Sequence, residues 1–378
     1  MDFSLTPQQE MLRDTVRRFF QTEVAPIARV CDDEERFPKE MIRQWGDLGL
    51  IGIRYPEEDG GSGFDKLGEC LAREEMSRVS QAFASTWSVQ AHMGLWPIWR
   101  SGTAEQKAKY FAPGLRGELV SCFGLSEPEG GSNIRALRTR ATKVPGGYRI
   151  SGSKMYITNS PIADFMLLAA RTRPELTPEA VSLFIVELPN PGIVIHKMAK
   201  EGIRASETGL LHIDEAFVPD EALLGGQEGT YPIILECLSE NRVGVAANCV
   251  GMAQGALDAA IAYARDREVG GKRIGHYQAI AHKLADMAAQ IEAARWLVYY
   301  GAWRIEQNTL DAATAAKVKL TASECALHVT EQAIRIHGGA GIMRDHAVGR
   351  FHRDAFVYVI GEGTSEIQRN IIARSLSL

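Results

Sequence analysis

Residues 116–133, RGELVSCFGLSEPEGGSN, mark the point at which the pattern of the sequence changes. The chain before this stretch has the periodicity of amphipathic helices, and it begins with the capping-box spacing of Thr6 and Gln9. A loop rich in proline and glycine, YPEEDGGSGF at 55–64, separates further helical runs. We therefore expect residues 1–118 to form an N-terminal helical domain.

The sequence that follows has a different pattern. Short apolar or alternating runs are separated by clusters of glycine, proline, asparagine and serine, such as PNPG at 189–192. Runs of this length and spacing are typical of strands in a compact β structure. We expect residues 119–230 to form a middle β domain, with strands near 119–125, 148–150, 155–157, 165–170, 181–186 and 210–217.

The remainder, residues 231–378, returns to helical periodicity. One helical face is formed by residues spaced by four, three and four positions, namely Ile280, Leu284, Met287 and Ile291. Alanine-rich segments at 244–264 and 311–336 suit close packing between helices. We expect a C-terminal four-helix bundle and an α+β fold in the order helical, β, helical.

Composition excludes several classes of protein. The net charge of −5 argues against an electrostatic surface for nucleic acid. None of the six cysteines lies in a C-x-x-C pair and no H-E-x-x-H motif occurs, so we expect no metal site. The first residues lack the basic and apolar regions of a signal peptide, and no run reaches the roughly 18 apolar residues of a membrane span. A cytoplasmic protein without membrane association is expected.

Four loops rich in glycine or hydroxyl residues adjoin regular elements: FGLSEPEGGSN (123–133), GSKMYITNS (152–160), IHGGAGI (336–342) and IGEGTSEIQR (360–369). In the last loop, Ser365 and Gln368 have capping-box spacing, which predicts a helix that starts there. The N-terminus of a helix offers free backbone N–H groups to anions and polarised carbonyls. Glu362, which precedes this helix among small residues, could therefore meet a ligand at close range.

With these four loops in this order, the chain resembles the acyl-CoA dehydrogenase family almost from end to end. The resemblance implies an FAD-dependent enzyme that oxidises an acyl-CoA thioester to the 2-enoyl-CoA. It places the catalytic base on Glu362, which would take the α-proton while the β-hydride passes to N5 of the flavin. The thioester carbonyl would be bound by a ribityl hydroxyl and by the backbone N–H of Glu362. Donors at the developing enolate lower the barrier, and exclusion of water should raise the pKa of this carboxyl.

The resemblance also assigns cofactor contacts. Around the flavin ring it implies Leu125, Ser126, Tyr156, Ile157, Thr158 and Thr364. A second set, which the neighbouring subunit contributes in family members, corresponds to Arg267, Arg335, Gly338, Gly339 and Gly341. This chain departs from the family where Gly270 stands for a phenylalanine, where Arg335 stands for a glutamine, and where Tyr156 stands for the commoner tryptophan.

For the substrate, the resemblance implies contacts from Ser132 and Arg242, and a site beside the base at Gly361. Asn133 and Arg135 depart from the usual residues of the CoA loop; Arg135 could meet a phosphate or a polar acyl group, or simply be solvated. Asn241, where some branches carry their base, cannot act as one.

The resemblance implies that the helix near residues 84–100 lines part of the acyl pocket. Its Trp87, Trp96 and Trp99, together with Gly361, point to a short, branched or ring-bearing acyl group, unless the tryptophans only pack the core. Ala84, where the glutaryl-CoA branch has an arginine, disfavours a dicarboxylate.

Other functions on the same fold remain open. An acyl-CoA oxidase or a dehydrogenase of acyl-carrier-protein thioesters is the nearest alternative, and a non-catalytic or DNA-binding relative is a remote one. Partners implied by the resemblance are electron transfer flavoprotein as electron acceptor and further copies of the chain in a homotetramer, a dimer of dimers.

Overall fold

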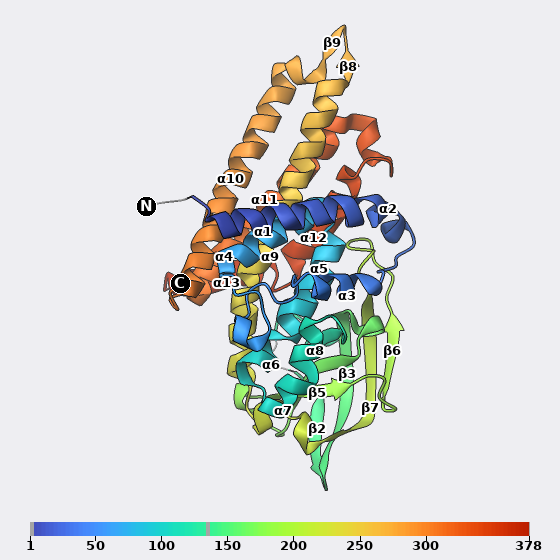
Figure 1. Ribbon diagram of the computed structural model, residues 1–378, viewed down its shortest axis with the longest axis vertical. Coiled ribbons are helices and arrows are strands. Elements are labelled where there is room, and N and C mark those ends of the chain that lie inside the picture. Colours follow the sequence, from blue (N-terminus) through green and yellow to red (C-terminus); the bar gives the residue numbers. More distant parts are fainter. Residues whose placement is uncertain (1–3, 134–136, 378) are drawn as a thin grey trace.

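The computed structural model describes residues 4–133 and 137–377, and its elements follow the predicted order (Figure 1). The N-terminal helices are α1 Pro7–Phe19, α2 Ala25–Asp33, α3 Glu40–Asp47, α4 Lys66–Val79, α5 Gln81–Ser88, α6 Trp96–Ser101, α7 Ala104–Gln106 and α8 Ala112–Leu115. Segments of π-helix at Phe20–Val24, Val89–Gly94 and Lys107–Phe111 lie between them. The capping box is confirmed, since Thr6 Oγ1 accepts from the Gln9 N–H at 3.2 Å and Gln9 Oε1 accepts from the Thr6 N–H at 3.0 Å.

The middle region is a mixed sheet. Its strands are β1 Ser121–Gly124, β2 Arg140–Val144, β3 Gly147–Thr158, β4 Phe165–Arg171, β5 Val181–Glu187, β6 Ile193–Lys197 and β7 Thr208–Pro219. They are ordered β1-β4-β2-β3-β7-β6, with β5 also paired to β4. β1 and β4 run parallel, so the loop after β1 leaves the sheet at the same edge as the end of β4.

Two strand predictions were wrong in detail. The runs at 148–150 and 155–157 belong to one long strand, β3, whose pairing with β7 shifts register between Lys154 and Ile157. β2 and β6 were not predicted, because most of their residues are exposed or half-exposed and give little hydrophobic signal. The bulge in β3 carries Tyr156.

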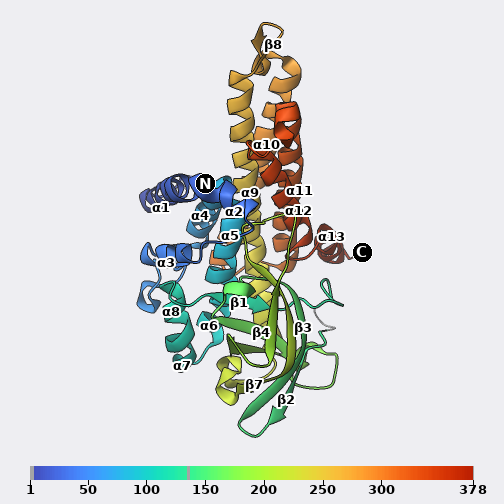
Figure 2. The same ribbon diagram turned by 90° about the vertical axis from the view of Figure 1, so that its right-hand side faces the viewer.

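The C-terminal region consists of long helices. They are α9 Tyr231–Asp266, α10 Gln278–Glu306, α11 Ala312–His337, α12 Val348–Ile360 and α13 Ser365–Ser375, with a small hairpin of β8 Glu268–Val269 and β9 Lys272–Arg273 between α9 and α10. Met287 and Ile291 are buried as expected, and Ile280 and Leu284 pack at the margin of the same core. Figures 1 and 2 show the hairpin at one end of the molecule and the sheet at the other.

Helix α9 connects the three parts of the molecule. It packs against α4 of the N-terminal region and against α10, α11 and α12. Contrary to the sequence prediction, α9 contains a window that is long and apolar enough to cross a membrane, with a mean hydropathy of 1.2. Of this window 72% is buried inside the protein, so the apolar character is explained by packing in the core.

Candidate active site

Glu362 lies in the short connection between α12 and α13, in a strained backbone conformation. Its φ is +56° and that of Gly363 is +86°. A non-glycine residue in the left-handed region persists only where its surroundings hold it. Here Gln368 Nε2 donates to the carbonyls of both residues, at 3.1 and 2.9 Å, and Lys319 Nζ donates to the Gly363 carbonyl at 2.9 Å. The connection is therefore pinned by two side chains that sequence reasoning did not identify.

The helix after this connection begins where it was predicted, but a different residue caps it. Thr364, not Ser365, is the N-cap: its Oγ1 accepts from the Ile367 N–H at 3.2 Å. Ser365 is the first helical residue, and Gln368 uses its amide to bind the two carbonyls instead of closing a capping box. The predicted N-cap was displaced by one residue, because threonine and serine are both favourable at that position.

The carboxyl group of Glu362 has one bound and one free oxygen. Oε1 accepts a hydrogen bond from Asn241 Nδ2 at 3.1 Å. Oε2 is buried and has no hydrogen-bond partner among the described residues. The backbone N–H of Glu362 also lacks a partner in the described part of the chain. An acceptor and a donor are thus left open on one residue, which is what removal of a proton next to a carbonyl requires.

The charge of Glu362 is set by opposing effects. Burial raises the pKa of its carboxyl, while Arg242, the Asn241 amide, Lys319 and Arg73 act to lower it, and the net direction is upward. Arg242 lies beside Asn241 on α9; burial lowers its pKa, and its Nε is buried without a partner. A carboxylate with a raised pKa in a region short of water is a better base than one in solvent.

The loop after β1 carries two of the predicted cofactor residues, Leu125 and Ser126. A buried ion pair holds it: Lys154 Nζ lies 2.9 Å from Glu127 Oε1 and donates to the Leu125 carbonyl at 3.1 Å. The Met155 N–H donates to the Ser126 carbonyl at 2.9 Å. Burial lowers the pKa of Lys154 to about 8. The sequence prediction named this loop but missed the pair that fixes it.

The second predicted loop lies on the bulge of β3. Tyr156 has a φ of +62° and is 66% exposed, while Ile157 is buried and Thr158 is half-buried. The side-chain hydroxyls of Ser126 and Thr158 make no hydrogen bond within the described residues. The exposed ring of Tyr156 and the free hydroxyls of Ser126 and Thr158 therefore lie on the loop after β1 and on β3. Hydrogen bonds from Lys154 and Met155 join these two segments.

The remaining predicted cofactor residues lie elsewhere. Arg267 caps the far end of α9 and is exposed, and Arg335 is an exposed residue that pairs with Glu331 at 2.6 Å. Gly338 and Gly339 are exposed, and a Cβ atom at either would meet nothing within 4 Å. Gly341 is buried below them, near Ile334.

A ring contact places the glycines after α11 near the end of α9 that carries Arg267. Tyr263 of α9 stacks on His337, with ring centroids 4.3 Å apart. Arg242 lies near the start of α9 and Arg267 follows its last residue, so at 1.5 Å per residue they are about 37 Å apart along the helix. The structure therefore separates the predicted cofactor residues into two groups.

Two of the predicted substrate residues, Ser132 and Gly361, lie in connections between regular elements. Ser132 is exposed in the loop after β1, and Gly361 precedes the base, with an added Cβ only 2.9 Å from the Val357 carbonyl oxygen. Arg135, for which a phosphate contact was weighed, lies outside the described residues.

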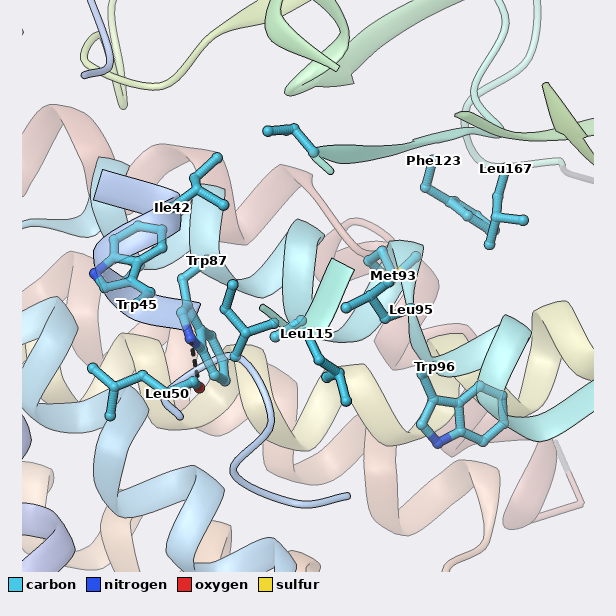
Figure 3. Close-up of a cluster of buried hydrophobic side chains, with 14 of the residues drawn as sticks. Ile42, Trp45, Leu50, Trp87, Met93, Leu95, Trp96, Leu115, Phe123 and Leu167 are labelled. Atoms are coloured by element: carbon cyan, nitrogen blue, oxygen red, sulfur yellow. Dashed lines mark hydrogen bonds between the residues drawn. The ribbon is translucent and has the colours of Figure 1, made fainter. Parts of the chain in front are cut away.

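The tryptophans of the predicted acyl-binding helix are core residues. Trp87 and Trp96 are each 1% exposed, and both belong to the cluster of buried apolar side chains drawn in Figure 3. Trp87 Nε1 donates to the Leu50 carbonyl at 3.0 Å, and Trp96 stacks on His92. Trp99 donates to Asp59 at 2.7 Å. Packing accounts for all three, so they give no measure of the acyl chain.

Metal chemistry has no candidate site in the described part of the chain. No group of three His, Cys, Asp or Glu side chains there could hold a metal ion. All six cysteines are free and buried.

Three family models match the chain in the order of its three structural regions. They are "Acyl-CoA dehydrogenase, N-terminal domain" at residues 6–118, "Acyl-CoA dehydrogenase, middle domain" at 122–216 and "Acyl-CoA dehydrogenase, C-terminal domain" at 229–377. The chain is 38% identical to the short-chain specific acyl-CoA dehydrogenase of Clostridium acetobutylicum, with 99% of each chain covered. It is also 38% identical to the benzylmalonyl-CoA dehydrogenase of Aromatoleum aromaticum, with 100% of each covered.

Solved structures agree with these relatives. The butyryl-CoA dehydrogenase of Megasphaera elsdenii superposes with a TM-score of 0.96 at 36% identity, covering 100% of each chain. A chain from a study of the electron transferring flavoprotein of Acidaminococcus fermentans has a TM-score of 0.96 at 38% identity, covering 100% of this chain and 99% of that one. A glutaryl-CoA dehydrogenase of Mycobacterium smegmatis in complex with FADH2 has a TM-score of 0.94 at 28% identity, covering 99% and 95%.

Proposed function

Since the chain belongs to the acyl-CoA dehydrogenase family, whose members depend on FAD, we propose that it oxidises an acyl-CoA thioester with Glu362 as the base. The observation that carries this proposal is the pair of open groups on Glu362. Its Oε2 is buried without a partner, and its backbone N–H is free among the described residues. Oε2 takes the α-proton, and the N–H donates to the thioester oxygen as negative charge develops there.

The residues of the loop after β1 and of the bulge in β3 fit the flavin ring. Tyr156 offers an exposed aromatic face, and the free hydroxyls of Ser126 and Thr158 can bind the polar edges of a ring system. FAD held by these residues would supply the acceptor for the hydride of the β-carbon. The Lys154–Glu127 pair holds the loop of Leu125 and Ser126, so these contacts are pre-organised before any ligand arrives.

Arg242 is proposed to bind part of the CoA moiety of the substrate. Its Nε is buried and unpartnered on the helix that also carries Asn241, and it lies close enough to Glu362 to lower the pKa of that carboxyl. A cation there can bind an anionic or strongly polar part of the ligand. Ser132, exposed on the neighbouring loop, is the second residue that we assign to CoA.

We assign a short, branched or ring-bearing acyl group to the substrate. The name of one relative, a short-chain enzyme, supports a short acyl group, and that of another, a benzylmalonyl-CoA enzyme, supports a ring, although the benzylmalonyl group is a dicarboxylate of the kind that Ala84 was expected to disfavour. Electron transfer flavoprotein is the proposed electron acceptor, supported by the similarity to a chain studied with such a protein. We further propose a cytoplasmic homotetramer with domains at 1–118, 119–230 and 231–378.

The test is the visible spectrum of the purified protein, followed without oxygen while saturated acyl-CoA thioesters are added one at a time. We expect a bound flavin whose absorption is lost with at least one short, branched or cyclic thioester. A flavin that no acyl-CoA reduces, but that an acyl-carrier-protein thioester does, would favour the carrier-protein alternative. Fast reoxidation of the reduced enzyme by oxygen would favour an oxidase.

A further inference from the structure

Asn241 is a polar side chain that the proposed mechanism does not use. It is 1% exposed, lies on α9 directly before Arg242, and donates from Nδ2 to Glu362 Oε1 at 3.1 Å. An amide can present either an oxygen or an NH₂ group to its neighbour, and only the NH₂ group favours the ionised form of a carboxyl. The orientation of this amide therefore affects the base.

Arg73 of α4 fixes that orientation. Its Nη2 donates to Asn241 Oδ1 at 3.2 Å, and its Nη1 donates to Ser88 Oγ at 2.8 Å. A guanidinium has only donors, so the amide oxygen must face Arg73 and the NH₂ group must face Glu362. A flipped amide would place two donors against each other on one side and two acceptors on the other.

Arg73 is itself enclosed. It is 0% exposed, its Nε forms an ion pair with Glu69 Oε1 at 2.7 Å without hydrogen-bond geometry, and its guanidinium lies 5.1 Å from the centroid of the Trp87 ring. Glu69 also pairs with Lys66 at 2.8 Å. Gly244 leaves the room that Arg73 occupies, since a Cβ atom there would lie 2.5 Å from the guanidinium carbon. A series of buried polar and charged side chains, Glu69, Arg73 and Asn241, thus leads from α4 to Glu362.

We propose that Arg73 and Asn241 are positioning residues, which act together to hold Glu362 with Oε1 bound and Oε2 free for the substrate α-proton. This inference rests on the proposed function of Glu362. The other groups that face this carboxyl are Arg242 and Cys237 of α9 and Lys319 of α11. Among them Asn241 is the direct hydrogen-bond donor to the carboxyl, so its loss removes the contact that most specifically stabilises the ionised form.

The experiment compares the rate of flavin reduction by a reactive acyl-CoA, in a single turnover from pH 5 to 10, for the wild type, Asn241→Ala and Arg73→Lys. The second variant keeps the cation and loses the two-nitrogen fork. Asn248→Ala is the matched control, because Asn248 is a fully buried asparagine on the same helix that makes no hydrogen bond to Glu362. The pKa of Glu362 is also measured without turnover, from the infrared band of a protonated carboxyl group that is absent in Glu362→Gln.

We expect Asn241→Ala to raise both the kinetic and the infrared pKa by about one pH unit, so that the rate falls about tenfold at pH values below the titration of Glu362 and recovers at high pH. Arg73→Lys should shift both in the same direction by less, and Asn248→Ala should leave both unchanged. Unaltered pKa values in Asn241→Ala, with Glu362→Gln inactive, would overturn this inference and leave the proposed function intact. An active Glu362→Gln would overturn both.

Discussion

The two groups of predicted cofactor residues differ in how the chain holds them. The first group consists of the connection at Glu362 and Thr364, the loop of Leu125 and Ser126, and the bulge in β3. There, buried side chains pin the backbone: Gln368 and Lys319 bind the carbonyls of the connection, and Lys154 binds the loop of Leu125. At the hairpin end, Arg267 is exposed, and Gly338 and Gly339 face open space. A single chain holds the first group in place by itself, whereas the second group, apart from the buried Gly341, is exposed to solvent.

This contrast supports the proposal that the second group serves a neighbouring copy. A ligand beside Glu362 would have to extend about 37 Å along α9 to reach Arg267 of the same chain. Exposed glycines with no atoms near their missing side chains also let another molecule approach the backbone closely.

Lys154→Met should have the largest effect, because it removes one partner of a buried ion pair and leaves Glu127 uncompensated. We expect a loss of about 3–5 kcal/mol in the free energy of unfolding and weaker retention of flavin. Lys143→Met, at an exposed ion pair with Asp220, is the control and should cost less than about 1 kcal/mol. Denaturant unfolding with the flavin spectrum as a second signal measures both. Equal losses in the two variants would mean that the Lys154 pair does not organise the loop.

Asp354 allows a comparison with Glu362, because it too is a buried carboxyl with one unpartnered oxygen. Burial raises its pKa from 3.8 to about 6, and its Oδ1 accepts from the Ile203 N–H at 2.6 Å. A raised folded-state pKa gives stability below pH 4 that is lost as the pH rises through about 6. Asn keeps the acceptor and removes the charge, so Asp354→Asn should be more stable than the wild type by about 2 kcal/mol at pH 8 and not at pH 4. Thermal unfolding at both pH values is the measurement, and a difference that does not depend on pH would contradict the assignment.

Mixed oligomers test whether the second group crosses between subunits. Arg267→Gln alone should weaken FAD binding about tenfold through loss of one charged contact. In a mixed dimer of Glu362→Gln and Arg267→Gln chains, a crossed arrangement leaves one site fully intact, because the intact Glu362 then meets Arg267 of the partner subunit. At limiting FAD such dimers, purified with two tags, should exceed the activity of either parent. Activity no higher than the average of the parents would show that each chain uses its own Arg267.

The smallest effect is expected at the exposed glycines. Gly338 has a φ of +59°, so Gly338→Ala should cost about 1 kcal/mol even though its Cβ atom meets no neighbour. Gly339→Ala lacks that strain and should change the free energy of unfolding by less than about 0.5 kcal/mol. If Gly339→Ala nevertheless weakens FAD binding, close approach to the backbone at this position is supported. Equal stability of the two variants would contradict the role of φ.

The sequence predicted the parts of this structure that leave a local pattern. The capping box at Thr6 and Gln9, the apolar face of Met287 and Ile291, and the helix after Glu362 all follow from spacing along one element. The order of the three regions was predicted for the same reason. By contrast, the exposed edge strand β6 carries too few buried residues to be recognised from its pattern.

The network behind the base could not be predicted in this way. Lys66, Glu69 and Arg73 follow each other at helical spacing, and a charged stripe of this kind normally indicates a face in solvent. It is buried here because α4 packs against α9. Its charges form ion pairs with one another, and Arg73 donates a hydrogen bond to the Asn241 amide. That contact joins residues far apart in the chain, and nothing in either segment alone signals it. The site residues assigned by resemblance remain predictions for the same reason.

The most direct test of the central claim is a single-turnover measurement on Glu362→Gln beside the wild type and Glu366→Gln, an exposed glutamate in the first turn of α13. With an acyl-CoA that reduces the wild-type flavin, we predict that Glu362→Gln binds FAD normally and reduces it about 10³-fold to 10⁴-fold more slowly, whereas Glu366→Gln keeps the wild-type rate. A Glu362→Gln variant whose flavin is reduced at a rate near that of the wild type would contradict the assignment of Glu362 as the base.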